Sequence, residues 1–302
     1  MTGGSGFFGL HVLGDLKKIG VPPENIFTPS PKELNLRKWD NCVKAAGERI
    51  RSIFMMKNCI RRIILVVRGI KMFKDWHLWL LARFRLLRKV GIGTFRMRDG
   101  SEFLIDFSRN EVGTFQEVWL MDMYEKHYRI QPGDKVVDIG ASIGAFSVLA
   151  AKRGARVYAY EPTPRSFSLL AQNIKGYSVT ASNLAVAGKT GRVRLFFAGR
   201  DEGNSLIHAQ SRSESLEVSA TTLDEILKKV GHCDFLKIDC EGGEMAIFEN
   251  ASPETWLRID RIAMEYHRNL PAILAILRGK GYDVTTGGKG GDYGHVYAER
   301  KR

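Results

Sequence analysis

The chain has 302 residues, 44% of them hydrophobic, a length that can bury one full α/β core and a smaller appendage. Its 46 Lys and Arg residues outnumber its 33 Asp and Glu residues, and the net charge of +13 suits anionic partners or simply high solubility. Cys42, Cys59, Cys233 and Cys240 form no C-x-x-C pair, which argues against a disulfide scaffold or a structural zinc site. No signal peptide pattern is present, and no apolar run approaches the ~20 residues that span a bilayer. We therefore expect a cytoplasmic protein that is soluble or peripheral at a membrane.

The first segment, residues 1–47, opens with the glycine-rich stretch MTGGSGFFGL and continues with apolar residues at helical spacing. Such a turn binds phosphate in a dinucleotide fold when a buried strand precedes it, and no strand precedes this one. The segment resembles the beginning of a nucleotide-sugar epimerase/reductase of the GDP-fucose synthase kind. Those enzymes also need a Tyr-x-x-x-Lys pair, and the spacing of Tyr297 and Lys301 in the C-terminal tail is best interpreted as chance. We interpret the segment as a truncated remnant, with an NADP-dependent oxidoreductase as the weaker alternative.

The second segment, residues 48–90, is rich in Lys and Arg among aliphatic residues and contains Trp76 and Trp79. The pattern predicts a basic amphipathic helical segment. Such a helix can lie on an anionic membrane surface, where each Lys or Arg contributes about 1 kcal/mol. It can equally pack its apolar face on the following domain and leave its charges in solvent. Nucleic-acid binding is not expected, because no recognised binding motif accompanies the charge.

The third segment, residues 91–302, has the pattern of an α/β domain. TFRMRDGSEFLIDF alternates around an Asp99-Gly100 turn and predicts a β-hairpin, and EVGTFQEVWLMDMYEKHYRI predicts a helix. From QPGD onward, strands and helices alternate at βαβ spacing, which predicts a doubly wound, mostly parallel sheet. The glycine-rich tail GYDVTTGGKGGDYGHVYAE predicts a C-terminal antiparallel hairpin.

The stretch KVVDIGASIGAFSVL contains a buried strand, a turn of small residues and a helix. Gly140 would let the backbone approach a ligand beside Ala141, and Gly144 would let the helix pack closely on the strand. Asp138 stands at the strand end, where a carboxylate would repel a pyrophosphate but suits the cationic amino-acid part of S-adenosylmethionine, directly or by orienting the turn. An ordinary strand-turn-helix with an acidic cap is the alternative.

The next predicted strand ends in Glu161, about twenty residues further on, and Pro162 precedes the following helix. A carboxylate at this position can accept hydrogen bonds from both ribose hydroxyls of a nucleoside. Two acidic residues at successive strand ends therefore predict an adenosyl site. Asn183, or the backbone near Ala185, is a candidate for the adenine side, although Asn183 could equally stabilise a loop.

Five motifs in order, DIGASIGAF, YAYEPTP, LEVSATTLDEIL, CDFLKIDCEGGEMAIFENA and RIAMEYH, resemble the FkbM family of methyltransferases over about two thirds of the chain. The block with Phe115, Glu117 and Trp119 resembles that family's cap over the cofactor. The resemblance implies a class I, Rossmann-like fold. It also implies transfer of a methyl group from S-adenosylmethionine to oxygen, commonly a hydroxyl on a sugar or a polyketide-like secondary metabolite.

Asp239 and Glu241 follow the fourth main strand, and Glu265 and His267 end the fifth, so these side chains should converge at the ligand crevice. A hydroxyl acceptor must lose its proton. His267 is the candidate base, with Asp239 or Glu241 as the alternative. His267 could instead cap a loop, and Glu241 and Glu244 could serve the helix dipole. A carboxylate cluster could also hold Mg²⁺, but no metal site is expected.

These features together predict an S-adenosylmethionine-dependent O-methyltransferase acting on a glycan, lipid-linked or secondary-metabolite hydroxyl. The alternative is a cofactor-binding or membrane-docking module without turnover. The presence of Asp138, Glu161 and Asp239 speaks against it.

Overall fold

The computed structural model divides the chain into two compact units, residues 1–67 and residues 68–302. The residues that it describes are 63–84, 86–87, 89–109, 111–197, 204–205, 215–287 and 292–301. The epimerase-like segment 1–47 therefore lies outside the described residues. Of the basic segment 48–90, the described part forms a helix over 63–72 and a second helix, α3 (Trp76–Arg83).

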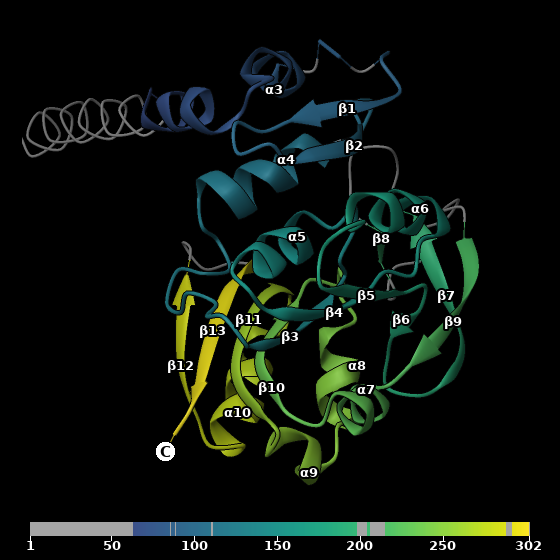
Figure 1. Cartoon of the computed structure of the whole chain (residues 1–302). Coiled ribbons are helices and arrows are strands. Elements are labelled where there is room, and N and C mark those ends of the chain that lie inside the picture. Colours follow the sequence, from purple (N-terminus) through teal and green to yellow (C-terminus); the bar gives the residue numbers. More distant parts are fainter. Residues whose placement is uncertain are drawn as a thin grey trace, which may run out of the picture. The chain divides into compact units, whose positions relative to one another are not determined.

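The second unit is built on a seven-stranded sheet (Figure 1). Its strand order is β5 (Val179–Ser182), β4 (Arg156–Tyr160), β3 (Lys135–Ile139), β10 (Cys233–Ile238), β11 (Ile259–His267), β13 (Tyr293–Arg300) and β12 (Tyr282–Gly287). The first five strands in this order are parallel, and β13 pairs antiparallel with both of its neighbours. The predicted α/β class, the mostly parallel sheet and the C-terminal hairpin are thus confirmed.

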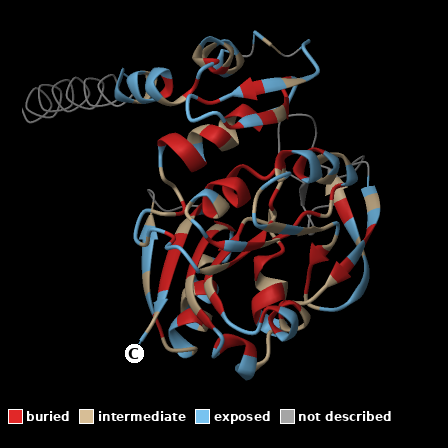
Figure 2. Ribbon diagram, in the orientation of Figure 1, coloured by how far each residue is buried: buried red, intermediate tan, exposed pale blue. Residues whose placement is uncertain are grey.

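Helices cover both faces of this sheet, because alternate residues of each buried strand point to opposite sides. Val137 and Ile139 of β3 belong to a core shared with α7 (Leu223–Val230), α8 (Glu244–Asn250) and α10 (Leu270–Gly279). The opposite face carries α5 (Ala145–Lys152) and α6 (Pro164–Asn173), and α9 (Pro253–Trp256) lies at the edge of the first core. The central strands and α5 are the most continuously buried elements (Figure 2).

The predicted hairpin is present as β1 (Ile92–Arg96) and β2 (Glu102–Asp106), paired antiparallel. The helix predicted after it is shorter than expected: α4 (Glu111–Phe115) passes into the π-helical turn η2 (Gln116–Leu120) and ends there. Asp122 adopts a left-handed conformation with a φ of 49°, and its carboxylate pairs with Arg68. A positive φ is incompatible with a right-handed helix, so the helix cannot continue through Asp122.

The chain between β5 and α7 forms a small second sheet, which the sequence analysis did not predict. Its order is β6 (Ala185–Val186), β9 (Ser215–Thr221), β7 (Gly191–Phe197) and β8 (Asn204–Ser205). Leu195 and Val218 are buried on one face of this sheet, in a small hydrophobic core of their own. No helix among the described residues is long and apolar enough to cross a membrane.

Candidate active site

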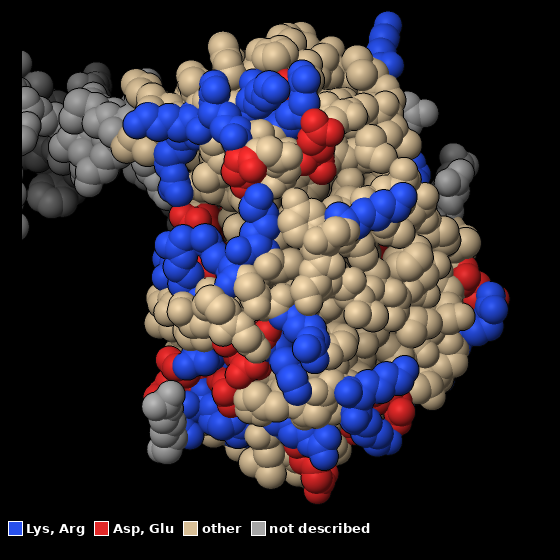
Figure 3. Space-filling model, viewed as in Figure 1, with Lys and Arg blue, Asp and Glu red and all other residues tan. Residues whose placement is uncertain are grey.

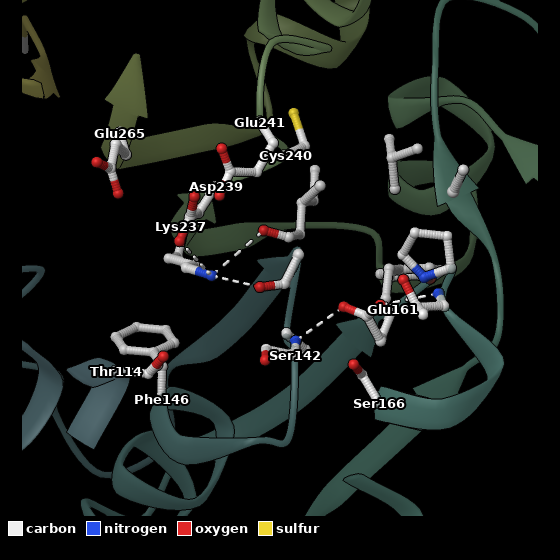
Figure 4. A pocket seen from close by; sticks show the side chains of 18 of the residues that line it. Thr114, Ser142, Phe146, Glu161, Ser166, Lys237, Asp239, Cys240, Glu241 and Glu265 are labelled. Atoms are coloured by element: carbon white, nitrogen blue, oxygen red, sulfur yellow. Dashed lines mark hydrogen bonds and ion pairs between the residues drawn. The ribbon is translucent and has the colours of Figure 1, made fainter. Parts of the chain in front are cut away.

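A cavity of about 410 Å³ opens at the carboxyl ends of β3, β4, β10 and β11, within the size range of small-molecule sites (Figure 4). The carboxyl ends of parallel strands surround the ligand crevice in open α/β sheets. One end of the cavity is formed by the turn after β3 and by Glu161. The other end carries Asp239, Glu241 and Glu265.

The turn after β3 depends on two glycines. Gly140 has a φ of 75°, and a β-carbon at this position would overlap the backbone carbonyl oxygen of Asp239. Gly144 has a φ of 89°, and a β-carbon there would lie 2.7 Å from Leu170 of α6. Gly140 thus lets the turn after β3 pack against the backbone of Asp239, and Gly144 lets it pack against α6. Close approach of the Gly140 backbone to a ligand stays a prediction.

Glu161 links the turn after β3 to the turn after β4 by hydrogen bonds. Its two carboxylate oxygens accept hydrogen bonds from the backbone N–H groups of Ser142 at 2.9 Å and Thr163 at 2.8 Å. Burial raises the pKa of Glu161, although these hydrogen bonds oppose the shift. A carboxylate has about four acceptor positions, and the Thr163 side chain also donates to Glu161, so one position remains for a hydroxyl group of a ligand in the cavity. Ala141 and Pro162 line the same end of the cavity.

Asp138 lies behind the turn and is fully buried. Its carboxylate accepts a hydrogen bond from Ser147 Oγ at 2.6 Å, and Lys237 Nζ lies 3.1 Å from its other oxygen. Asp138 does not line the cavity. Of the two roles considered for it, orientation of the turn fits this position better than direct contact with a ligand.

Lys237, on β10, is a site residue that the sequence reasoning missed. Its Nζ donates to Gly140 O at 2.7 Å, and it lies 3.8 Å from a carboxylate oxygen of Asp239 (Figure 4). Burial lowers the pKa of Lys237, but the charges of Asp138 and Asp239 outweigh burial and raise it. The available signal was a lysine between Leu236 and Ile238 in the strand CDFLKI, since a buried lysine needs an anionic partner.

Four carboxylates, which we call the acidic wall, line the end of the cavity opposite Glu161: Glu117, Asp239, Glu241 and Glu265. Burial and the charge of Asp239 raise the pKa of Glu265 to about 8 and that of Glu117 to about 7. Tyr124 donates its hydroxyl to Asp239 Oδ2 at 2.9 Å. Sequence reasoning placed Glu117 in a cap, but did not place it beside Asp239, and it missed Tyr124.

His267 lies beside the acidic wall rather than in the cavity lining. Its Nε2 is 3.1 Å from Glu241 and its Nδ1 is 3.2 Å from Glu244. Burial favours the neutral ring, but the hydrogen bonds with Glu241 and Glu244 outweigh burial and raise the pKa of His267 to about 10. At neutral pH the ring is therefore protonated, which makes His267 a poor proton acceptor. Glu244 also accepts from the Gly242 N–H at 3.0 Å, as a first-turn acid does.

Asn183 supports the loop instead of lining the cavity. Its side-chain amide donates to the carbonyl oxygens of Glu161 and Pro162 at 2.8 and 3.0 Å. The nearby cavity wall is apolar and consists of Ala185, Val186 and Leu195. The loop-stabilising alternative fits this geometry better than a contact with adenine.

The carboxylate oxygens of the acidic wall do not lie close enough together, among the described residues, to form a candidate metal site. The group that does converge is His232, Asp234 and Asp260, at the amino ends of β10 and β11. It lies at the opposite end of the strands from the cavity, so it takes no part in the candidate site.

Comparison with known proteins assigns this part of the chain. Residues 138–284 match the family model described as the methyltransferase FkbM domain. A similar curated protein is the 31-O-demethyl-FK506 methyltransferase FkbM of Streptomyces tacrolimicus, 26% identical over 210 residues, covering 56% of this chain and 81% of that protein. The methyltransferase sdnD of Sordaria araneosa is 22% identical over 191 residues, covering 50% of this chain and 74% of that protein. Among solved structures, TrmK of M. capricolum in complex with S-adenosyl-homocysteine has a TM-score of 0.40 and 10% identity, covering 61% of this chain and 68% of that one.

The chain therefore carries a methyltransferase domain, and its cofactor is S-adenosylmethionine. The residues of the cavity fit that molecule. Glu161 offers a free acceptor position for a ribose hydroxyl, and the wall at Ala185, Val186 and Leu195 is apolar, as an adenine ring requires. The opposite end is anionic, as a sulfonium cation requires. The family match begins at residue 138, and these similarities do not support the expected epimerase-like character of segment 1–47.

Proposed function

We propose that the chain transfers a methyl group from S-adenosylmethionine to a hydroxyl oxygen of a sugar, glycan or secondary-metabolite acceptor. The observation that carries this proposal is the position of Glu265 in the cavity, with a pKa raised to about 8, opposite the end formed by Glu161. A general base works best when its pKa lies near the working pH. The name of the Streptomyces relative describes an O-demethyl substrate, which supports oxygen as the acceptor atom.

In this proposal, the end of the cavity formed by Glu161 and the turn after β3 holds the adenosyl part of the cofactor. Glu161 would accept a hydrogen bond from a ribose hydroxyl, and Gly140 and Ala141 of the turn after β3 would lie along the same part of the cofactor. When bound, S-adenosylmethionine supplies the methyl group on its sulfonium. Lys237 holds the turn by donating to the Gly140 carbonyl oxygen, and Asp138 pairs with Lys237 on the side away from the cavity.

The acidic wall serves the acceptor. In the transfer, the oxygen–carbon bond forms as the sulfur–carbon bond breaks, and the hydroxyl proton passes to a carboxylate. Glu265 and Asp239 are the candidates that line the cavity, and Tyr124 keeps Asp239 in place by its hydrogen bond. His267 fixes Glu241 and Glu244 as a cation and takes no proton.

Docking at an anionic membrane surface is a second proposal, made for the basic segment 48–90. Ile63, Ile64 and Val67 are 63%, 53% and 45% exposed, so part of this helix presents apolar side chains. Cosedimentation with vesicles containing phosphatidylglycerol, at low and high salt, tests it. Binding that persists after the basic segment is deleted would remove the proposal.

Calorimetric titration with S-adenosylhomocysteine, with NADPH as the control, tests the cofactor site first. We expect binding of the former alone. Transfer of isotopically labelled methyl groups to a panel of hydroxylated glycosides and macrolides, with amine analogues beside them, then tests the acceptor atom. Labelling of the amines alone would contradict O-methylation.

A further inference from the structure

A second cavity, of about 720 Å³, lies beside the active site in the same unit, and we call it the basic cavity. Its walls come from Arg68 and Met72, from η2 and residues 121–129, and from the end of α5. Within the described part of the chain, it shares no lining residue with the active-site cavity. It is therefore a separate hollow.

The charges of the basic cavity do not balance. Three carboxylates in its lining each pair with one cation: Asp122 with Arg68 at 2.8 Å, Asp99 with Lys152 at 2.8 Å, and Glu125 with Arg153 at 3.2 Å. Two further cations, Lys126 and Arg129, also line the cavity, and neither pairs with an acidic residue among those described. Lys126 lies 6.0 Å from the centre of the Tyr297 ring, a contact that leaves its charge uncompensated. The cavity thus carries two surplus positive charges.

Part of the basic cavity's wall is apolar and buried. Trp119 and Leu149 are each 6% exposed, and the Trp119 indole N–H is held by Ala145 O at 3.2 Å. Met121, which is 39% exposed, adds an accessible apolar surface. A cavity lined by both apolar side chains and uncompensated cations suits a ligand that combines an anionic group with an apolar part.

We propose that the basic cavity binds an organic phosphate, with Lys126 and Arg129 at the phosphate group and the apolar part of the ligand against Trp119 and Met121. Arginine and lysine are the side chains that most often hold phosphate, because their donors form charge-assisted hydrogen bonds. Lys and Arg side chains also predominate over acidic ones on the face of the molecule that carries the β1–β2 hairpin (Figure 3).

The chain segment between the two cavities makes this site distinct from the methyl-transfer site. Glu117 and Tyr124 line the active-site cavity, whereas Trp119, Met121 and Lys126, from the same segment, line the basic cavity. A phosphate ligand of the basic cavity would therefore contact the side of segment 117–126 that does not line the active-site cavity. It should bind whether or not S-adenosylhomocysteine fills the active site.

Isothermal titration of the full chain tests the proposal with two soluble probes, inorganic phosphate and hexyl phosphate. The test variant is the double substitution Lys126→Gln and Arg129→Gln, and Met121→Glu is a second variant at an exposed position. Lys175→Gln with Lys189→Gln is the matched control, because both of these lysines are exposed and line neither cavity. We expect hexyl phosphate to bind more tightly than inorganic phosphate. The double variant loses two charge-assisted contacts, so its affinity for hexyl phosphate should fall about tenfold or more. The affinity of the control variant should equal that of the wild type.

Phosphatidylcholine vesicles with and without phosphatidic acid distinguish a lipid headgroup from a soluble ligand. Binding to the acidic vesicles that hexyl phosphate displaces would identify a lipid phosphate as the source, and hexyl phosphate binding without vesicle binding would identify a soluble one. Absence of hexyl phosphate binding, an equal loss in the control, or displacement of hexyl phosphate by S-adenosylhomocysteine would overturn the proposal. Because the readout is binding, it is independent of whether the chain methylates a hydroxyl.

Discussion

The backbone carbonyl of Asp239 lies against the α-carbon of Gly140, so closely that no side chain fits between the turns that follow β3 and β10. The contact joins the two ends of the candidate site, since Gly140 belongs to the cofactor turn and Asp239 to the acidic wall.

Gly140→Ala should therefore damage both folding and cofactor binding. A non-glycine residue at positive φ costs about 1–2 kcal/mol by itself, and the overlap with a backbone atom adds to this. We expect a loss of about 2 kcal/mol or more in the free energy of unfolding and at least tenfold weaker S-adenosylhomocysteine binding. Gly133→Ala is the matched control, because Gly133 has a φ of 92° with open space around it. Equal effects of the two substitutions would show that the close approach is unimportant.

Lys237→Met should leave the buried Asp138 carboxylate without its cation. Removal of one partner of a buried pair costs about 3–5 kcal/mol, because an uncompensated charge remains. Adding Asp138→Asn to Lys237→Met should recover part of this loss. Urea unfolding of the two single variants and the double variant measures the coupling. Strictly additive effects would argue against a functional pair between these residues.

His267 should make the stability of the protein depend on pH above neutrality. Its folded-state pKa of about 10 exceeds its ordinary value of 6.5, so the stabilisation is fully present below about pH 6.5 and is lost as pH rises through about 10. Urea unfolding between pH 6 and pH 10 should show this decline in the wild type and a smaller one in His267→Gln. A Glu241→Gln variant should lie between the two, because one of the two hydrogen-bonded carboxylates remains. An identical slope in wild type and His267→Gln would place the proton elsewhere.

Glu265→Gln should lower turnover about 10²-fold or more, the usual contribution of a general base. In the wild type, kcat/KM should rise with pH through about 8, because Glu265 accepts a proton only when ionised. The variant should lose this rise while its affinity for S-adenosylhomocysteine changes by no more than a few-fold. Glu249→Gln, at an exposed position of α8, serves as the control. A Glu265→Gln enzyme with the wild-type pH profile would transfer the role of base to Asp239.

The local patterns of the sequence determined the fold class and one end of the site. Alternating strand and helix patterns predicted the parallel sheet, and acidic residues at two strand ends predicted where Asp138 and Glu161 would lie. Such features can be read from the sequence because a strand, a turn of small residues and a helix are specified by neighbours in the chain.

The tertiary structure alone decided which charges meet. Lys237 precedes Asp239 by two residues, but its ion pair with Asp138 joins two separate strands. Glu117 and Tyr124 come from another segment, and nothing local to that segment indicates that it lies near Asp239. The same holds for His267, which the sequence identified as a residue that titrates near neutrality. Its protonation state depends on Glu241 and Glu244, because a pKa is set by burial and by the charges around a group, and those are properties of the folded chain.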